Sequence, residues 1–124
     1  MTFLGLAPYL YYTDAAAALD WMSRVLGFRE VARHVVDDDG TVREAEMAVG
    51  DARIHLCGLD PAAYERPAGQ LVIVYVDDVD AHHARVTAAG FAAPAPVDKP
   101  YGARNYTFTD PFRQTWTFWQ DLLT

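Results

Sequence analysis

The chain has 124 residues and a mass of 13.8 kDa, the size of one ordinary domain, which excludes a dinucleotide-binding module joined to a separate catalytic domain. Its 17 acidic and 10 basic residues give a net charge of -7, so neither nucleic acid nor an anionic membrane is an expected partner. The single cysteine, Cys57, cannot form an internal disulfide, and we expect a cytoplasmic protein without a cleaved signal.

The chain begins with an apolar, tyrosine-rich run that ends at residue 13 and is predicted to contain a strand. Asp14 follows it, where a carboxylate can cap a helix by accepting a hydrogen bond from a free backbone N–H. The spacing of three and four residues between apolar side chains predicts a helix with one buried face, formed by Ala15, Ala18, Leu19, Met22, Val25 and Leu26. Gly27 is predicted to end that helix in the left-handed conformation.

The rest of the first half is predicted to form three strands, at about residues 28–36, 41–49 and 52–57. Asp37–Gly40 and Gly50–Asp51 have the composition of hairpin turns between them. Residues 59–69 contain Pro61, Pro67 and Gly69 and are predicted to be an exposed linker.

The second half repeats the order of the first. Residues 71–78 align with residues 7–14, so that Asp78 takes the cap position of Asp14, and Gly90 takes that of Gly27. The repeat is less regular after its helix, because prolines at 94, 96 and 100 interrupt the next strand; the last strands are predicted at residues 105–109 and 114–120. We therefore expect one domain over residues 1–124, with a first module at 1–58 and a second at 70–124, each of the order βαβββ.

Three motifs accompany this tandem order: Leu26-Gly27-Phe28 closes the first helix, Val76-Asp77-Asp78-Val79-Asp80 opens the second, and Asp110-Pro-Phe-Arg-Gln-Thr-Trp116 lies near the end. With these motifs the chain resembles the glyoxalase/bleomycin-resistance/extradiol-dioxygenase (vicinal oxygen chelate) superfamily. The resemblance implies an α+β fold, in which two tandem modules form an open, incompletely closed barrel-like sheet around a cleft with the helices outside. It implies no single activity, because that superfamily contains lyases, isomerases and dioxygenases as well as non-catalytic drug binders.

The resemblance also implies where a metal ion would be held, on the first and last strands of the two modules. In this sequence the four positions are Ala7, His55, Leu71 and Thr117. Only His55 has a good ligating side chain, whereas a catalytic metal site needs about three such ligands. We therefore expect no metal, no other cofactor and no catalytic residue.

Alternate residues of a strand share a face, so the same alignment predicts which side chains line the cleft. The predicted ligand-binding residues are Tyr9, Tyr11, Glu44, Glu46, His55, Ile73, Tyr75, Asn105, Thr107, Thr117 and Trp119. The side chains predicted to face the helices are Leu6, Leu10, Val72, Val74, Trp116 and Phe118. Two alternatives stay open: His55 is either a hydrogen-bonding pocket residue or an inert strand residue, and Tyr11 and Tyr75 either contact a ligand or belong to the core. His82 and His83 are expected at the surface or at an interface.

The leading hypothesis is a non-catalytic homodimer with shared clefts that binds and sequesters a bulky aromatic small molecule, an antibiotic or natural product, and so confers resistance. The acidic charge favours a neutral or cationic ligand. The alternative is an enzyme of the same superfamily acting on a small molecule: a lyase, isomerase or tailoring enzyme with His55 or Glu44 as the base, or a metal-dependent glyoxalase or dioxygenase.

Overall fold

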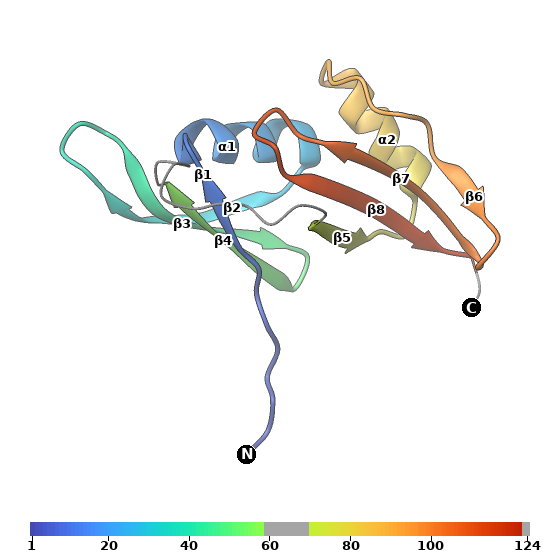
Figure 1. The fold of residues 1–124 in the computed structure, drawn as a ribbon, viewed down its shortest axis with the longest axis horizontal. Helices are drawn as coiled ribbons and strands as arrows, with labels where there is room; N and C mark the ends of the chain where they lie inside the picture. Colours follow the sequence, from blue (N-terminus) through green and yellow to red (C-terminus); the bar gives the residue numbers. More distant parts are fainter. Residues whose placement is uncertain (59–69, 123–124) are drawn as a thin grey trace. The chain divides into compact units, whose positions relative to one another are not determined.

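The computed structural model describes residues 1–58 and 70–122, and the predicted linker 59–69 lies outside the described residues. The chain divides into two compact units, Met1–Arg66 and Pro67–Thr124, which we call module 1 and module 2. Each contains a four-stranded mixed sheet and one helical segment in the order βαβββ (Figure 1). The predicted α+β fold of two tandem modules is confirmed.

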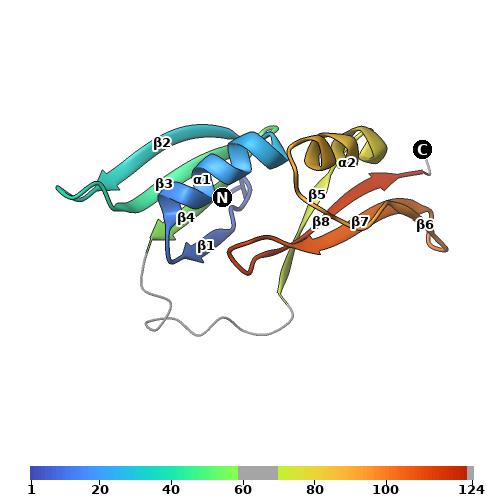
Figure 2. The ribbon, with the colours of Figure 1, turned by 90° about the horizontal axis from the view of Figure 1, so that it is seen from above.

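Module 1 consists of β1 (Tyr9–Tyr12), α1 (Ala15–Trp21), a π-helical turn (Met22–Leu26), β2 (Arg29–Val36), β3 (Val42–Val49) and β4 (Ala52–Gly58). The strand order in the sheet is β1-β4-β3-β2, with β1 parallel to β4 and the other pairs antiparallel. The helix α1 lies across one face of this sheet (Figure 2). Among the described residues of module 1, no helix covers the other face.

The helix of module 1 begins and ends where the sequence predicts. The Asp14 carboxylate accepts a hydrogen bond from the backbone N–H of Ala17 at 3.0 Å, and Gly27 ends the segment with a φ of 83°. Every residue of the predicted apolar face is buried. The π-helical last turn is not predicted by the spacing of three and four residues, and at its start Trp21 is buried beside Met22.

Module 2 consists of β5 (Leu71–Tyr75), α2 (Val79–Ala88), β6 (Val97–Lys99), β7 (Ala103–Thr109) and β8 (Thr115–Asp121), with the strand order β5-β8-β7-β6. Asp78 caps α2 by accepting from the N–H of Ala81 at 3.0 Å. The strand β6 has only three residues and lies between Pro96 and Pro100, which lack the N–H that a longer ladder needs.

One prediction about side-chain placement is wrong. Leu6 does not face a helix: it is 90% exposed, because β1 starts only at Tyr9 and the segment before it runs away from the sheet (Figure 1). His82 and His83, which were expected at the surface or at an interface, are half-buried. His82 Nδ1 lies 2.5 Å from the hydroxyl of Tyr106, and its ring stacks on Phe118 at a centroid distance of 3.9 Å, while His83 Nε2 lies 3.0 Å from the carbonyl oxygen of Ala93.

No helix within residues 1–58 and 70–122 is long and apolar enough to cross a membrane.

Candidate functional site

Each sheet has one face packed under its helix and one open face. In module 1 the side chains of Ala45, Met47, Ile54 and Leu56 are buried, whereas Glu44, Glu46 and His55, which alternate with them along β3 and β4, point the other way. In module 2 Trp116 and Phe118 are buried on the helix side. The pairing of these central strands runs without a register shift, so alternate residues keep to one face, and the predicted ligand-binding residues share the face opposite the helix in each sheet.

The open face of module 1 brings its five predicted residues into two adjacent rows across the sheet. The Cα register places Tyr9, His55 and Glu46 in one row, and Tyr11, Cys57 and Glu44 in the other. Tyr9 and Tyr11 meet edge to face at a centroid distance of 5.2 Å, and the Tyr9 ring lies roughly parallel to that of His55 at 6.4 Å. The row geometry therefore groups two phenols, an imidazole and two carboxylates on one surface.

Tyr9 is held by a short hydrogen bond, in which its hydroxyl donates to Glu44 Oε1 at 2.5 Å. This bond to Glu44 is the main reason why the pKa of the Tyr9 phenol is raised; partial burial and the neighbouring Cys57 thiol raise it further. Tyr9 therefore keeps its proton under ordinary conditions and acts as a fixed donor to the carboxylate.

Glu46 is in a different electrostatic environment from Glu44. Its Oε1 lies 3.1 Å from His34 Nε2, and its Oε2 lies 3.1 Å from Arg53 Nε. The hydrogen bond to His34 is the main reason why the pKa of the Glu46 carboxyl is lowered; burial opposes this shift, and the neighbouring His55, His34 and Arg53 add to it. Glu46 is therefore an ionised group whose charge is compensated within the protein.

His34 is a site residue that the sequence analysis missed. It lies on β2, where the pairing with β3 shifts register between Glu30 and Ala32 and again between Arg33 and Val35. Such irregularities break the alternation of faces, so a count along the sequence cannot tell where the side chain points. Arg53 lies two residues before His55 on β4 and shares its face, as strand alternation predicts.

The open face of module 2 repeats the two-row arrangement with other side chains. One row contains Ile73, Thr117 and Thr107, and the other contains Tyr75, Trp119 and Asn105. When the two sheets are compared row by row, His55 of module 1 corresponds to Thr117 of module 2, and Glu44 corresponds to Asn105. The repeat keeps the backbone geometry, replaces the carboxylates and the imidazole of the first face with hydroxyls and an amide, and has the Trp119 indole in the position of the Cys57 thiol.

Trp119 is the centre of an aromatic cluster on this face. Its ring lies edge to face with Tyr75 at 6.1 Å and stacks on Tyr101 at 5.3 Å with an interplanar angle of 28°. Tyr75 is 68% exposed and Tyr101 is 57% exposed. Tyr101 was missed by the sequence analysis because it lies in the turn after β6, where no strand periodicity assigns it to a face.

Two of the predicted residues on this face are buried by their neighbours. Asn105 is 4% exposed and donates through Nδ2 to the hydroxyl of Tyr101 at 3.2 Å. Thr117 is 6% exposed, and its Oγ1 lies 2.7 Å from that of Thr107. Asn105 thus supports the exposed ring of Tyr101, whereas Thr117 bonds across the sheet to Thr107.

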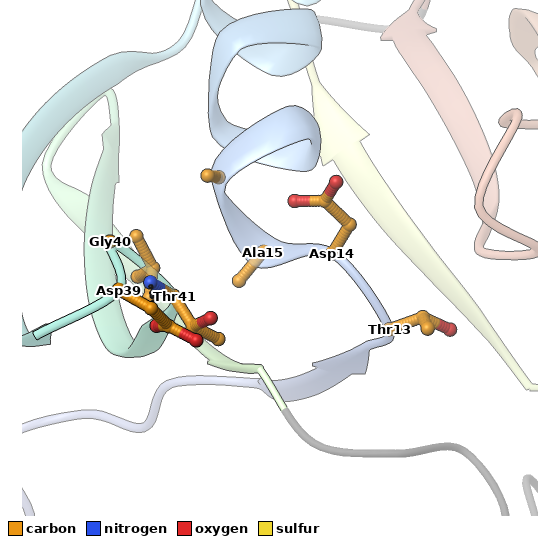
Figure 3. Close-up of a pocket in the computed structure, with 8 residues that line it drawn as sticks. Thr13, Asp14, Ala15, Asp39, Gly40 and Thr41 are labelled. Carbon is orange, nitrogen blue, oxygen red and sulfur yellow. Dashed lines mark hydrogen bonds between the residues drawn. The ribbon is translucent and has the colours of Figure 1, made fainter. Parts of the chain in front are cut away.

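A separate depression of about 460 Å³ lies where the start of α1 meets the β2–β3 turn (Figure 3). None of the predicted site residues lines it. Its carboxylates already bind backbone N–H groups: Asp14 caps α1, and Asp39 accepts from Thr41 N at 2.9 Å, which lowers the pKa of Asp39. Its polar groups thus serve the helix cap and the turn.

The positions that the resemblance assigns to a metal do not provide a suitable donor set. Ala7 and Leu71 offer only alkyl groups, Thr117 bonds to Thr107, and His55 is the one good ligand of the four. Within residues 1–58 and 70–122, no group of three His, Cys, Asp or Glu side chains is arranged to hold a metal ion. The residues present therefore do not fit the divalent ion of the metal-dependent relatives.

Comparison with known proteins places this geometry in a family. A family model described as the Glyoxalase/Bleomycin resistance protein/Dioxygenase superfamily matches residues 5–118. TioX from Micromonospora sp. ML1 is 34% identical, with a TM-score of 0.74 over 97% of this chain and 98% of that one. A search among curated proteins gives no match.

Two other similar structures have names that mention antibiotics. The bleomycin-binding protein from bleomycin-producing Streptomyces verticillus, solved in complex with copper(II)-bleomycin, is 25% identical, with a TM-score of 0.63 over 95% of this chain and 96% of that one. TnmS3, an antibiotic binding protein from Streptomyces sp. CB03234, is 24% identical, with a TM-score of 0.72 over 98% and 99% of the two chains, and shows a shared fold.

Proposed function

The chain belongs to the glyoxalase/bleomycin resistance protein/dioxygenase superfamily, and we propose that it is a non-catalytic member that binds a bulky aromatic small molecule. The ligand class is an antibiotic or natural product, and the biological effect is resistance. The family itself includes enzymes, so the proposal depends on the chemistry of the two open faces.

The observation that carries the proposal is the exposed aromatic surface on the open face of each module. Module 1 presents Tyr9 and Tyr11, and module 2 presents Tyr75, Tyr101 and Trp119. Aromatic pairs of this geometry contribute about 0.5–1.5 kcal/mol each beyond the burial of their area. A flat aromatic ligand gains several such contacts at once, and the names of two similar proteins state that they bind antibiotics.

Sequestration needs no bond to be made or broken. A protein that holds a toxic compound lowers its free concentration by mass action, in proportion to the ratio of protein concentration to Kd. Contact area, a few polar groups and a suitable charge are sufficient for this, and the two faces provide them. The side chains at the four positions that the resemblance assigns to a metal also lack the ligands that the metal-dependent chemistry of the family requires.

The proposal includes a homodimer, in which module 1 of one chain and module 2 of its partner line each cleft. A closed two-fold arrangement then gives two equivalent sites. Light scattering tests this part. We expect a dimer with and without ligand, and a monomer under both conditions would contradict it.

A titration distinguishes the binder from the alternative enzyme. A panel of aromatic antibiotics is added to the protein while tryptophan fluorescence is recorded, since Trp119 lies among the exposed rings of module 2. Each ligand is then recovered and its mass is measured. Saturable quenching with an unchanged mass supports sequestration, whereas a new mass supports a lyase, isomerase or tailoring enzyme.

A further inference from the structure

The two carboxylates on the open face of module 1 differ in how their charge is compensated. Glu46 contacts both His34 and Arg53 at 3.1 Å. Glu44 receives the Tyr9 hydroxyl on Oε1, and within residues 1–58 and 70–122 no Lys, Arg or His forms an ion pair with it. Among the described residues, one negative charge on this face is thus balanced by basic groups and the other is not.

The basic residues nearest to Glu44 in the sequence and in the strand register form ion pairs with other acidic residues. Arg43, the residue before Glu44, pairs with Asp37 through Nε at 2.8 Å and donates through Nη1 to the carbonyl oxygen of Gly58. Arg53 pairs with Glu46, and His34 does the same. The remaining basic group on this face, His55, lies against the Tyr9 ring in the row of Glu46.

The surroundings of Glu44 suit a positively charged partner. Tyr9 fixes one oxygen of the carboxylate, so little side-chain entropy remains to be lost when a ligand binds. The ring of Tyr9 stands beside this carboxylate, and the ring of Tyr11 lies 5.2 Å from that of Tyr9; the faces of such rings attract cations. The net charge of -7 draws cations toward the protein from a distance.

From this arrangement we propose that the open face of module 1 selects an aromatic ligand that carries a positive charge, and that Glu44 is the residue that determines this selectivity. The proposal rests on the proposed function, because it names the ligand class of the same site. In module 2 the corresponding position is Asn105, which has no charge, so the cationic end of the ligand is assigned to module 1.

A matched pair of probes tests the proposal. Acridine and 10-methylacridinium have nearly the same shape, and in mildly alkaline buffer only the second is charged. Their affinities are measured by calorimetry for the wild-type protein, for Glu44→Gln and for Glu30→Gln. The glutamine at position 44 keeps an oxygen that can accept the Tyr9 hydrogen bond. Glu30 pairs with Arg33 on β2 and serves as a control with the same change in net charge.

We expect the wild-type protein to bind 10-methylacridinium about 10- to 100-fold more tightly than acridine, the range of a charge-assisted contact. Glu44→Gln should remove most of this preference, because it weakens the binding of 10-methylacridinium far more than that of acridine, while Glu30→Gln keeps the preference. If the wild type binds acridine without preferring 10-methylacridinium, or if Glu44→Gln weakens the binding of both probes equally, the assignment of Glu44 is overturned. The proposed aromatic binding function would survive either result. If the wild type binds neither probe, the proposed aromatic binding function fails with it.

Discussion

The indole N–H of Trp116 donates a hydrogen bond to the carboxylate of Asp110 at 2.9 Å, and both residues are buried. The same carboxylate accepts from the backbone N–H groups of Phe112, at 2.8 Å, and Gln114, at 2.9 Å. Asp110 thus ties the turn between β7 and β8 to the helix-facing core of module 2. The segment Asp110-Pro-Phe-Arg-Gln-Thr-Trp116, which carries much of the family resemblance, has a structural role here.

Asp110→Ala should lower the free energy of unfolding by about 3 kcal/mol, because it leaves an indole N–H and two backbone N–H groups without their acceptor. Urea denaturation measures the change. Asp38→Ala removes an exposed carboxylate from a turn and should change stability by no more than about 0.5 kcal/mol. Equal effects of the two substitutions would contradict the structural role of Asp110.

Arg113 is the only non-glycine residue within residues 1–58 and 70–122 with a positive φ, at 77°. The left-handed conformation costs a residue with a side chain about 1–2 kcal/mol, and glycine avoids most of that cost while losing more entropy on folding. Arg113→Gly should therefore stabilise the protein by up to about 1 kcal/mol, whereas Arg113→Ala should not. Thermal unfolding of the two variants makes the comparison, and a stabilising alanine would rule out strain as the explanation.

Burial raises the pKa of the Tyr106 phenol, whose hydroxyl lies 2.5 Å from His82 Nδ1. Above a pH of about 10 the unfolded chain releases this proton while the folded protein retains it, so the free energy of unfolding should fall as the pH rises. Tyr106→Phe should cost about 1 kcal/mol at neutral pH through the lost hydrogen bond, and should lose less stability in alkali.

Urea denaturation at neutral and alkaline pH checks this prediction. Part of the alkaline decrease should remain in Tyr106→Phe, because the pKa of Tyr9 is raised as well. If the free energy of unfolding of Tyr106→Phe falls with alkaline pH as steeply as that of the wild type, the Tyr106 phenol does not cause the alkaline loss of stability.

The open-face assignment predicts that Tyr11→Ala and Trp119→Ala weaken ligand binding by about 10- to 100-fold, because each removes an aromatic contact worth about 1–3 kcal/mol. Neither side chain is part of the helix-facing core, so circular dichroism should show an intact fold. Phe3→Ala is a control, since Phe3 is 87% exposed and precedes the sheet. Binding that survives both substitutions would show that the ligand does not use these faces.

Sequence patterns predicted most of the fold because its determinants are local. The carboxylates of Asp14 and Asp78 mark both helix starts, and alternation along β4 separates Ile54 and Leu56 from His55. These features depend on backbone geometry that repeats every two or every three to four residues.

The missed features depend on geometry that no local period encodes. The face of His34 is set by register shifts in β2, and the place of Tyr101 is set by a turn that stacks it on Trp119. The stacking of His82 on Phe118 is likewise set by the packing of α2 over β8. Each of these contacts joins residues that are distant in sequence, which a count along one strand or helix does not detect.

The central claim is that the protein holds an aromatic ligand without changing it, and native mass spectrometry tests this most directly. The spectrum of the protein with a binding antibiotic reports the oligomeric state, the number of bound ligands and the ligand mass together. The account predicts a dimer that carries up to two ligands of unaltered mass, in keeping with two equivalent sites. A bound or released species of altered mass would contradict it, because the protein would then be an enzyme.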